Sequence, residues 1–300
     1  MSISHHDIPE VDTRLTREPA SELEAVGCAL CGADDFVEVD RQRGFRMVRC
    51  RQCGLVYLNP RPTPQWLRRS YQDYLPAEPD DVARWNRMME PLYRSARRRL
   101  MARFPAAGRL LDVGCACGRF LEIMRSAGWR VEGLEVCAPA AEACRRNGLE
   151  VRTATLAESE LPPGRCEAVT MFYVLEHLRD PVGGLRKLHA ALKPGGLCLA
   201  RVPDTTPIVR LLKRFGRRTE LYDAPYHLYD YAPGVLARVF REAGFRNVRI
   251  CIDAATRPAR LGPRGISMGF SWIGRALERL TAGRFLLPGV SKTAVAEKRR

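Results

Sequence analysis

Between residues 109 and 204, short apolar runs of strand length alternate with segments whose apolar residues recur at the period of a helix. The first run, Arg109-Leu-Leu-Asp-Val, leads into a turn of small residues from Gly114 to Gly118 and then into a helical segment. Small residues in such a turn let the backbone N–H groups at a helix N-terminus approach a ligand closely. Regular alternation of strand and helix predicts a mostly parallel, doubly wound sheet with helices on both faces, so the chain belongs to the α/β class.

The sheet has seven predicted strands. They cover residues 109–113, 129–134, 150–153, 166–174, 197–202, 247–252 and 292–296. A helix is expected over 139–147, and another begins at Pro181, where Asp180 is a suitable N-cap. The run Lys193-Pro-Gly-Gly is expected to end that second helix.

The small-residue turn does not match the dinucleotide pattern G-x-G-x-x-G. That pattern needs glycine at positions 114, 116 and 119, whereas the chain has Ala116 and Arg119. About twenty residues after the turn, the second strand ends at Glu135. A carboxylate in this place can accept hydrogen bonds from both hydroxyls of a ribose. The pattern therefore favours a nucleoside-containing cofactor other than a dinucleotide.

The segment Asp112-x-Gly114-x-Ala116-x-Gly118 resembles the D-x-G-x-G-x-G motif of class I S-adenosylmethionine-dependent methyltransferases. Further family motifs follow in the family's order, and the resemblance spans roughly residues 105–253. They are the acidic end of the second strand, Val-Leu-Glu-His-Leu-x-Asp-Pro, Leu-Lys-Pro-Gly-Gly and Arg-Glu-Ala-Gly-Phe-Arg-Asn-Val. The resemblance implies a Rossmann-like, doubly wound, seven-stranded sheet. It also implies transfer of a methyl group from S-adenosylmethionine to an acceptor by in-line displacement.

The same resemblance assigns residues to the cofactor. The turn, with Gly114, Cys115, Ala116 and Gly118, would cradle the methionine end of the cofactor, and Asp112 would support the turn. Glu135 would bind the ribose. Thr155 and Leu156 would flank the adenine, and Phe172 and Tyr173 would lie beneath the methyl group. Two positions depart from the family pattern: Ala116 replaces the central glycine, and Thr155 stands where many members have an acidic residue.

Two histidines are candidates for the general base that an acceptor hydroxyl would need. His177 lies in the motif before the helix at Pro181, and His227 lies in an aromatic segment, Tyr222-Asp-Ala-Pro-Tyr-His-Leu-Tyr. The alternative for each is a structural role in the core. His189 lies near an apolar helical face and is expected to be a core histidine.

Four of the eleven cysteines form the pattern C-x2-C-x18-C-x2-C, namely Cys28, Cys31, Cys50 and Cys53. This spacing predicts a zinc ribbon, with iron in a rubredoxin-like arrangement as the alternative. Four thiolates leave no open coordination position, so the zinc would be structural. A four-cysteine ribbon followed by Leu-Val-Tyr-Leu-Asn-Pro-Arg-Pro also looks like the front end of some bacterial methyltransferases, several of which act on sugars, glycans or other small acceptors.

The net charge of +15 is concentrated near the C-terminus, since residues 1–100, 101–200 and 201–300 carry net charges of +1, +2 and +12. Residues 207–218 and an insertion at about 254–290 combine this charge with apolar residues at helical spacing. Such segments suit the surface of an anionic membrane or an anionic, lipid-linked acceptor. The competing interpretation is a solvated, arginine-rich face over a substrate lid. The nearly neutral cysteine region argues against the alternative function, a nucleic-acid-binding zinc-ribbon protein or RNA methyltransferase.

The expected organisation has four parts. They are a flexible N-terminal tail (1–27), the zinc ribbon (28–60), a helical linker (61–104) and the methyltransferase domain (105–300) with its basic amphipathic insertion. The longest run without a charged residue has ten residues, Gly265 to Gly274, and the first residues lack the pattern of a secretory signal. We therefore expect a cytoplasmic protein whose basic segments would permit peripheral contact with the inner membrane surface.

Overall fold

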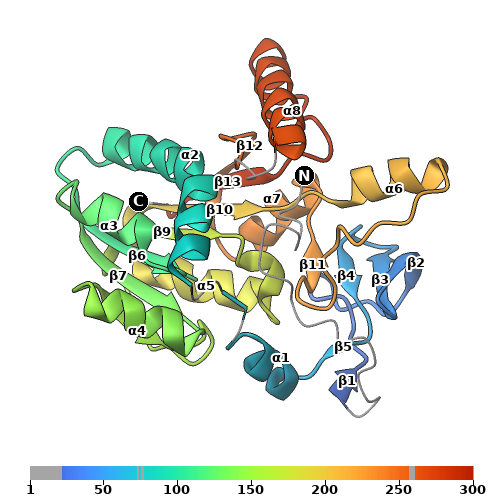
Figure 1. Ribbon diagram of the computed structural model, residues 1–300, viewed down its shortest axis with the longest axis horizontal. Helices are drawn as coiled ribbons and strands as arrows, with labels where there is room; N and C mark the ends of the chain where they lie inside the picture. Colours follow the sequence, from blue (N-terminus) through green and yellow to red (C-terminus); the bar gives the residue numbers. More distant parts are fainter. Residues whose placement is uncertain (1–21, 73, 76–77, 257–260, 300) are drawn as a thin grey trace.

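The computed structural model describes residues 22–72, 74–75, 78–256 and 261–299. Its centre is a seven-stranded sheet in the order β12–β13–β10–β9–β6–β7–β8 (Figure 1). The strands are β6 (Arg109–Val113), β7 (Arg130–Glu135), β8 (Glu150–Thr153), β9 (Cys166–Phe172), β10 (Leu192–Val202), β12 (Arg246–Cys251) and β13 (Lys292–Glu297). The predicted seven-stranded α/β sheet is confirmed.

The strand order reverses at β6. Strands β7 and β8 follow it on one side, whereas β9 and β10 lie on the other, and all these neighbours are parallel. Only β13 runs antiparallel to its neighbours β10 and β12. The loops that leave β6 and β9 diverge at this reversal, and ligands of open α/β sheets bind in the crevice that such a divergence opens.

Alternating side chains send the two faces of the sheet into two different cores, because successive residues of a strand point to opposite faces. Leu110 and Ala168 pack with α2 (Pro79–Arg103) and α3 (Arg119–Arg125). Their neighbours Leu111 and Val169 pack on the other face with α5 and α7. These two helices are α5 (Pro181–Ala191) and α7 (Pro233–Glu242), while α4 (Ala138–Arg146) covers β7 and β8.

The ends of α5 show where the local prediction holds and where it is wrong. Asp180 caps the helix as predicted, since its Oδ1 accepts a hydrogen bond of 2.8 Å from the N–H of Gly183. The helix ends at Ala191, but β10 begins at Leu192 rather than at Leu197. The register with β9 shifts between Leu192 and Leu197, so Lys193-Pro-Gly-Gly is accommodated as an irregularity inside the strand.

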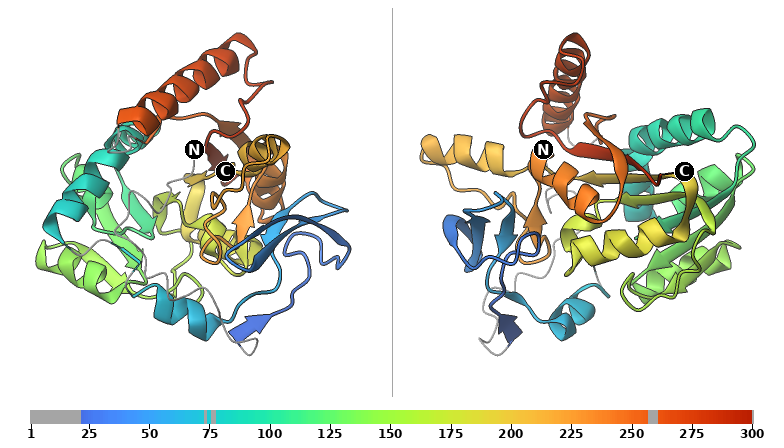
Figure 2. Two further views of the ribbon diagram at one scale, coloured as in Figure 1. Left: turned by 45° about the vertical axis from the view of Figure 1, so that its right-hand side comes forward. Right: turned by 180° about the vertical axis from the view of Figure 1, so that it is seen from behind.

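The cysteine region folds into a second sheet, whose strands are β2 (Phe36–Gln42), β3 (Phe45–Cys50), β4 (Val56–Leu58) and β11 (Tyr229–Asp230). Strands β2 and β3 pair antiparallel between the two cysteine pairs. The fourth strand was not predicted, because β11 comes from the chain between β10 and α7 and pairs antiparallel with β4. Figure 2 shows this sheet beside the larger one.

The segments around the cysteine region include short elements that the sequence did not indicate. Strand β1 (Leu23–Glu24) pairs with β5 (Arg61–Pro62), within the 1–27 range predicted as a tail. Residues 1–21 of that range lie outside the described residues. Helix α1 (Pro64–Ser70) follows β5 and precedes the predicted linker helix α2.

Two helices carry most of the exposed apolar residues. Helix α6 (Thr206–Arg214) follows β10, and α8 (Leu261–Leu280) lies in the predicted insertion between β12 and β13. In Figures 1 and 2, α8 projects away from the central sheet. Among the described residues, no helix has both the length and the apolarity needed to span a bilayer.

Candidate active site

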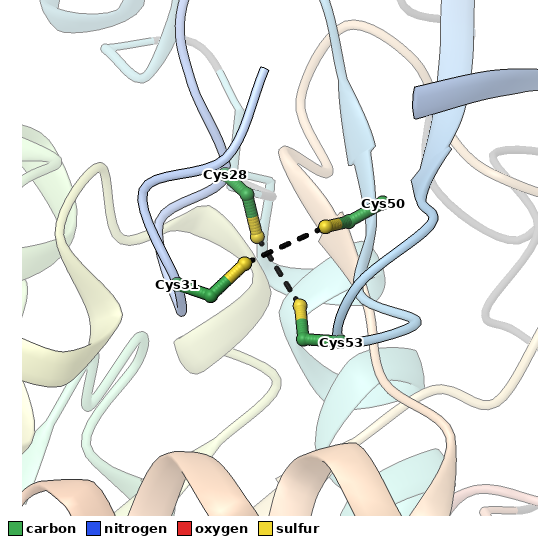
Figure 3. A group of neighbouring side chains, drawn as sticks. All are labelled: Cys28, Cys31, Cys50 and Cys53. Carbon is green, nitrogen blue, oxygen red and sulfur yellow. Dashed lines mark hydrogen bonds between the residues drawn. The ribbon is translucent and has the colours of Figure 1, made fainter. Parts of the chain in front are cut away.

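The four predicted metal-ligating cysteines converge on one point (Figure 3). Cys28 Sγ lies 3.3 Å from Cys53 Sγ, and Cys31 Sγ lies 3.5 Å from Cys50 Sγ. A tetrahedral zinc with Zn–S bonds of about 2.3 Å places its sulfur atoms roughly 3.8 Å apart. The four thiols therefore need only a small outward shift to surround one such ion.

The backbone around these cysteines explains why each pair is followed by glycine. Gly32 and Gly54 have φ angles of +76° and +78°, which glycine adopts without strain. Their N–H groups donate to the carbonyls of Cys28 and Cys50 at 2.8 and 3.0 Å, closing two equivalent turns. Burial raises the pKa of the Cys28 and Cys53 thiols and opposes ionisation of Cys50 as well, whereas hydrogen bonds from the backbone and from neighbouring thiols lower the pKa of Cys50 to about 7.

The small-residue turn after β6 has the strained backbone of a ligand-binding loop. Gly114, Ala116 and Gly118 all have positive φ angles, of +69°, +47° and +76°. A Cβ atom on Gly114 would overlap Val174 Cγ2, so this position requires glycine. Ala116 adopts the left-handed conformation although it has a Cβ atom, and Gly118 is the N-cap of α3.

Glu135 links this turn to the end of β7. Its Oε2 accepts a hydrogen bond of 2.8 Å from the Ala116 N–H, and its Oε1 accepts one of 2.9 Å from the Cys137 N–H. The side chain is only 4% exposed, and burial raises the pKa of its carboxyl against the opposing effect of these N–H groups. Glu135 thus fixes the geometry of the turn while it borders the space in front of it.

Asp112 lies behind the turn. Burial raises the pKa of its carboxyl to about 7, although Oδ1 accepts a hydrogen bond of 2.6 Å from the Thr170 hydroxyl, which lowers that pKa. This bond joins β6 to β9 at the point where the strand order reverses. Asp112 therefore supports the turn from within the sheet.

A cavity of about 840 Å³ opens in front of the turn, at the carboxyl ends of β6, β7 and β9. Nine of the predicted site residues line it, namely Gly114, Ala116, Glu135, Thr155, Leu156, Phe172, Tyr173, His177 and His227. The other three are not part of the lining, since Asp112 and Gly118 lie behind it and Cys115 packs with α4 in a small separate core. His189 lies outside the cavity, with its ring 5.0 Å from that of Phe245.

His177 and His227 lie together at one end of this cavity, with ring centroids 4.8 Å apart. His177 is the last residue of the 3-10 turn η4 (Leu175–His177), and its Nδ1 lies 3.0 Å from both the Tyr226 carbonyl and the Tyr71 hydroxyl. His227 Nε2 lies 3.6 Å from Asp223 Oδ2. This end can therefore exchange a proton with a bound hydroxyl.

Glu176 is buried against the same pair. Its side chain is fully inaccessible, and burial, together with the charges of Asp230 and Asp223, raises the pKa of its carboxyl well above the usual range. One donor atom from each of Glu176, His177 and His227 can be chosen so that all three atoms lie within 4.8 Å of one another. The sequence analysis did not single out Glu176, although it precedes His177 in the quoted motif.

The linker supplies the remaining wall of the cavity, and it was not predicted to do so. Tyr71, Gln72 and Tyr74 line the space from the segment between α1 and α2, and Trp85 lines it from α2. The rings of Tyr71 and Tyr74 each lie 5.8 Å from that of His177. Two tyrosines within four residues of the end of α1 were the available signal, but nothing local indicated that they would reach this cavity.

Comparisons with known proteins agree with this geometry. A protein-family model described as "Methyltransferase domain" matches residues 85–250, more than half of the chain. The match begins in α2 and ends in β12, so it contains the turn, Glu135 and both histidines but not the four cysteines.

Curated relatives match a similar part of the chain. The ubiquinone biosynthesis O-methyltransferase of Bordetella bronchiseptica is 33% identical over 149 residues, which cover 45% of this chain and 61% of that protein. The protein of the same name from Albidiferax ferrireducens is 29% identical over 137 residues, with 43% and 54% covered. The chain thus spans about half to two thirds of the length of these relatives.

A solved structure shows the same fold. Phosphoethanolamine N-methyltransferase 2 of Haemonchus contortus, in complex with S-adenosyl-L-methionine, superposes with a TM-score of 0.52. The two chains are 13% identical, and the match covers 82% of this chain and 63% of that one. At this identity the likeness concerns the arrangement of the sheet and its helices.

Proposed function

The chain belongs to the class I S-adenosylmethionine-dependent methyltransferases, and from this premise we propose that it methylates a small-molecule acceptor held in the cavity at the carboxyl ends of β6, β7 and β9. One observation carries the proposal. The turn at Gly114 with Glu135, and the pair His177 and His227, line the same cavity. A cofactor at the first group and an acceptor at the second would therefore meet without any change of fold.

At the cofactor end, we assign the methionine part of S-adenosylmethionine to the turn from Gly114 to Gly118 and the ribose to Glu135. Both oxygens of Glu135 already accept backbone hydrogen bonds, but each carboxylate oxygen has a second lone pair that a ribose hydroxyl can use. Thr155 and Leu156 would flank the adenine. Phe172 and Tyr173 would lie beneath the methyl group.

At the acceptor end, we assign His177 and His227 to removal of the acceptor proton. The sulfonium is an activated donor, so the protein mainly has to hold the acceptor in line with it. Such positioning can lower the activation barrier by several kcal/mol. A hydroxyl acceptor also has to lose a proton, for which a base contributes about 10²–10⁴-fold. The relatives named above are O-methyltransferases by name, which supports a hydroxyl as the acceptor group.

The walls of the acceptor end favour a partly apolar acceptor. Tyr71, Tyr74 and Trp85 present aromatic surface, which stacks on flat or ring-shaped molecules. Arg179, which pairs with Glu24, and Lys187, which donates to the Ala157 carbonyl, also line the cavity and can attract an anionic group. Sugar-based, glycan and lipid-linked acceptors that carry such a group all meet these requirements.

We propose further that the four-cysteine cluster holds one structural zinc. The four sulfur atoms converge as tetrahedral coordination requires, and no fifth donor or open position is needed. The small sheet β2–β3–β4 packs Met47, Val48 and Leu58 into the main core, and a metal would add stability at the cysteine turns. Metal binding can contribute on the order of 10–16 kcal/mol to the folding of such a unit.

The exposed faces of α6 and α8 support contact with an anionic membrane, which would give access to a lipid-linked acceptor. Phe215 is 71% exposed at the end of α6, and Trp272 on α8 is also 71% exposed. Basic residues lie among the exposed apolar ones, including Lys213 and Arg214 beside Phe215, and Arg275 and Arg279 near Trp272. Apolar insertion combined with basic flanks is the chemistry of interfacial helices.

Replacing Glu135 tests the cofactor assignment. Glu135→Ala should weaken S-adenosylmethionine binding by more than about tenfold, roughly 1.4 kcal/mol, because it removes the ribose acceptor and releases the Ala116 N–H. Calorimetry on the folded variant measures this. Glu132→Ala is the control on the same strand, because Glu132 pairs with Arg165 and Arg109 away from the cavity. An unchanged affinity in Glu135→Ala would contradict the assignment.

Replacing the two histidines tests the acceptor end. His177→Ala and His227→Ala should each lower kcat by about 10²-fold or more once an acceptor is in hand, with S-adenosylmethionine binding retained. His189→Ala, outside the cavity, controls for nonspecific loss. Full turnover in both variants, with native circular dichroism, would eliminate the catalytic role.

Replacing one cysteine tests the zinc assignment. The protein purified without chelators should contain about one zinc per chain by elemental analysis, and Cys50→Ser should lose it because three thiolates bind zinc more weakly than four. Cys117→Ser, which changes a half-buried cysteine outside the cluster, should keep the metal. A metal-free wild-type protein would refute the zinc site.

Vesicle binding tests the membrane surface. The protein should co-sediment with phosphatidylglycerol vesicles at low salt but not with phosphatidylcholine vesicles, and Arg275→Glu with Arg279→Glu should reduce binding several-fold. Arg94→Glu, an exposed charge on α2, serves as the matched control. Failure to bind anionic vesicles at low salt would remove the membrane proposal and leave the cavity assignments unaffected.

A further inference from the structure

We propose that Glu176, His177 and His227 form a second metal site, which binds a divalent cation such as manganese or iron at the acceptor end of the cavity. Its catalytic consequence rests on the methyl transfer proposed above, whereas its existence does not. The three residues come from two places in the chain, η4 and the loop before β11. The fold therefore brings them together over about fifty residues of sequence.

The donor set is chemically specific. Two imidazoles and one carboxylate, each with a donor atom within 4.8 Å of the others, make the 2-His-1-carboxylate combination that binds divalent transition metals and leaves coordination positions open. Bond lengths of about 2.0–2.2 Å with angles near 90–110° place neighbouring donors of one ion about 2.8–3.6 Å apart. The three donor atoms lie within 4.8 Å of one another, so the side chains would have to rotate toward the ion to bind it.

Glu176 is the observation that points to a ligand. The side chain is 0% exposed, and neither carboxylate oxygen accepts a hydrogen bond from another residue in the described part of the chain. A buried polar group without a partner costs several kcal/mol. A cation between Glu176 and the two histidines would give both oxygens a partner.

His177 is already held as metal-binding histidines usually are. In the tautomer with the ring proton on Nδ1, the ring donates to the Tyr226 carbonyl at 3.0 Å, and the Tyr71 hydroxyl lies at the same distance from this nitrogen. Nε2 then carries the lone pair. A backbone carbonyl that fixes the tautomer in this way is the common outer partner of a metal-ligating histidine.

His227 has the other common outer partner. The Asp223 carboxylate lies 3.6 Å from its Nε2, and both side chains are buried. A carboxylate beside a ligating histidine orients the ring and raises its basicity. Glu176 and Asp223 also supply the negative charge that a divalent cation needs in a buried place, and both histidines border the cavity through which the ion would enter.

With the ion bound, the lone pairs of His177 and His227 would be on the metal, so the ion, in place of a free imidazole, would promote loss of the acceptor proton. An acceptor hydroxyl bound at an open position would have a lowered pKa, as water bound to a catalytic metal does, and would release its proton to solvent. The oxygen then forms the new C–O bond to the methyl carbon while the S–C bond breaks. The electron pair of that bond stays on sulfur, which leaves neutral S-adenosylhomocysteine.

Manganese binding tests the site on tag-free, zinc-loaded protein. Mn²⁺ prefers oxygen and nitrogen donors, so the four cysteines do not compete for it. Titration followed by electron paramagnetic resonance, in the presence of S-adenosylhomocysteine, should reveal one bound Mn²⁺ with histidine nitrogen coupling in spin-echo modulation. Glu176→Gln should weaken this binding at least ~tenfold, and His227→Asn should do the same and reduce the nitrogen coupling.

Glu142→Gln is the matched control, because Glu142 lies on the surface of α4 and pairs with Arg145. Its Mn²⁺ affinity should equal that of the wild type. Absence of tight Mn²⁺ binding, or binding that survives both Glu176→Gln and His227→Asn in folded protein, would overturn the metal site. Calorimetry with S-adenosylhomocysteine on the same samples separates the metal site from the proposed function. Cofactor binding without Mn²⁺ binding would overturn the metal site alone. Mn²⁺ binding without cofactor binding would overturn the proposed function alone.

Discussion

The pairing of β11 with β4 is the interaction on which the acceptor end of the cavity depends. Tyr229 and Asp230 pair with Tyr57 and Val56, and the Leu228 carbonyl accepts a hydrogen bond of 2.9 Å from the Leu58 N–H. On its other side, the Leu228 N–H donates to the Glu176 carbonyl, also at 2.9 Å. Hydrogen bonds thus hold the segment that carries His227 to the cysteine sheet on one side and to η4 on the other. A metal that stabilises the cysteine sheet would therefore also stabilise the wall of the acceptor end.

Three buried carboxyl groups near the cavity differ because their hydrogen-bond partners differ. Glu135 accepts two backbone N–H bonds, which hold the cofactor turn and oppose the rise that burial causes in its pKa. Asp112 accepts one hydroxyl bond inside the sheet and has its pKa raised to about 7. Glu176 accepts none from other described residues. All three carboxyl groups are buried, so it is their hydrogen-bond partners that distinguish Glu135, which fixes the turn, and Asp112, which joins two strands, from Glu176.

What could be predicted from the sequence was local. The period of apolar residues was sufficient for the seven strands, and Asp180 before Pro181 was sufficient for the start of α5. Glu135 could be placed because a strand end fixes where its side chain lies. By contrast, Tyr71, Glu176 and β11 depend on contacts between segments more than fifty residues apart. No periodicity or motif in those segments carries that information, so the aromatic wall and the attachment of the cysteine sheet were found only in the structure.

Part of the excess positive charge in the last third of the chain lies inside the fold and is not available to an external partner. Lys292 is fully buried, and its ammonium donates to Asp204 Oδ2 at 2.8 Å and to the carbonyls of Leu287 and Val290. Arg201 is also buried, where its guanidinium bonds the Tyr173 hydroxyl at 2.9 Å behind the cavity wall. These two charges stabilise the sheet edge and the cavity wall. Exposed arginines also lie beside exposed apolar residues on α6 and α8, and this coincidence of charge and apolar surface is the basis of the membrane contact proposed above.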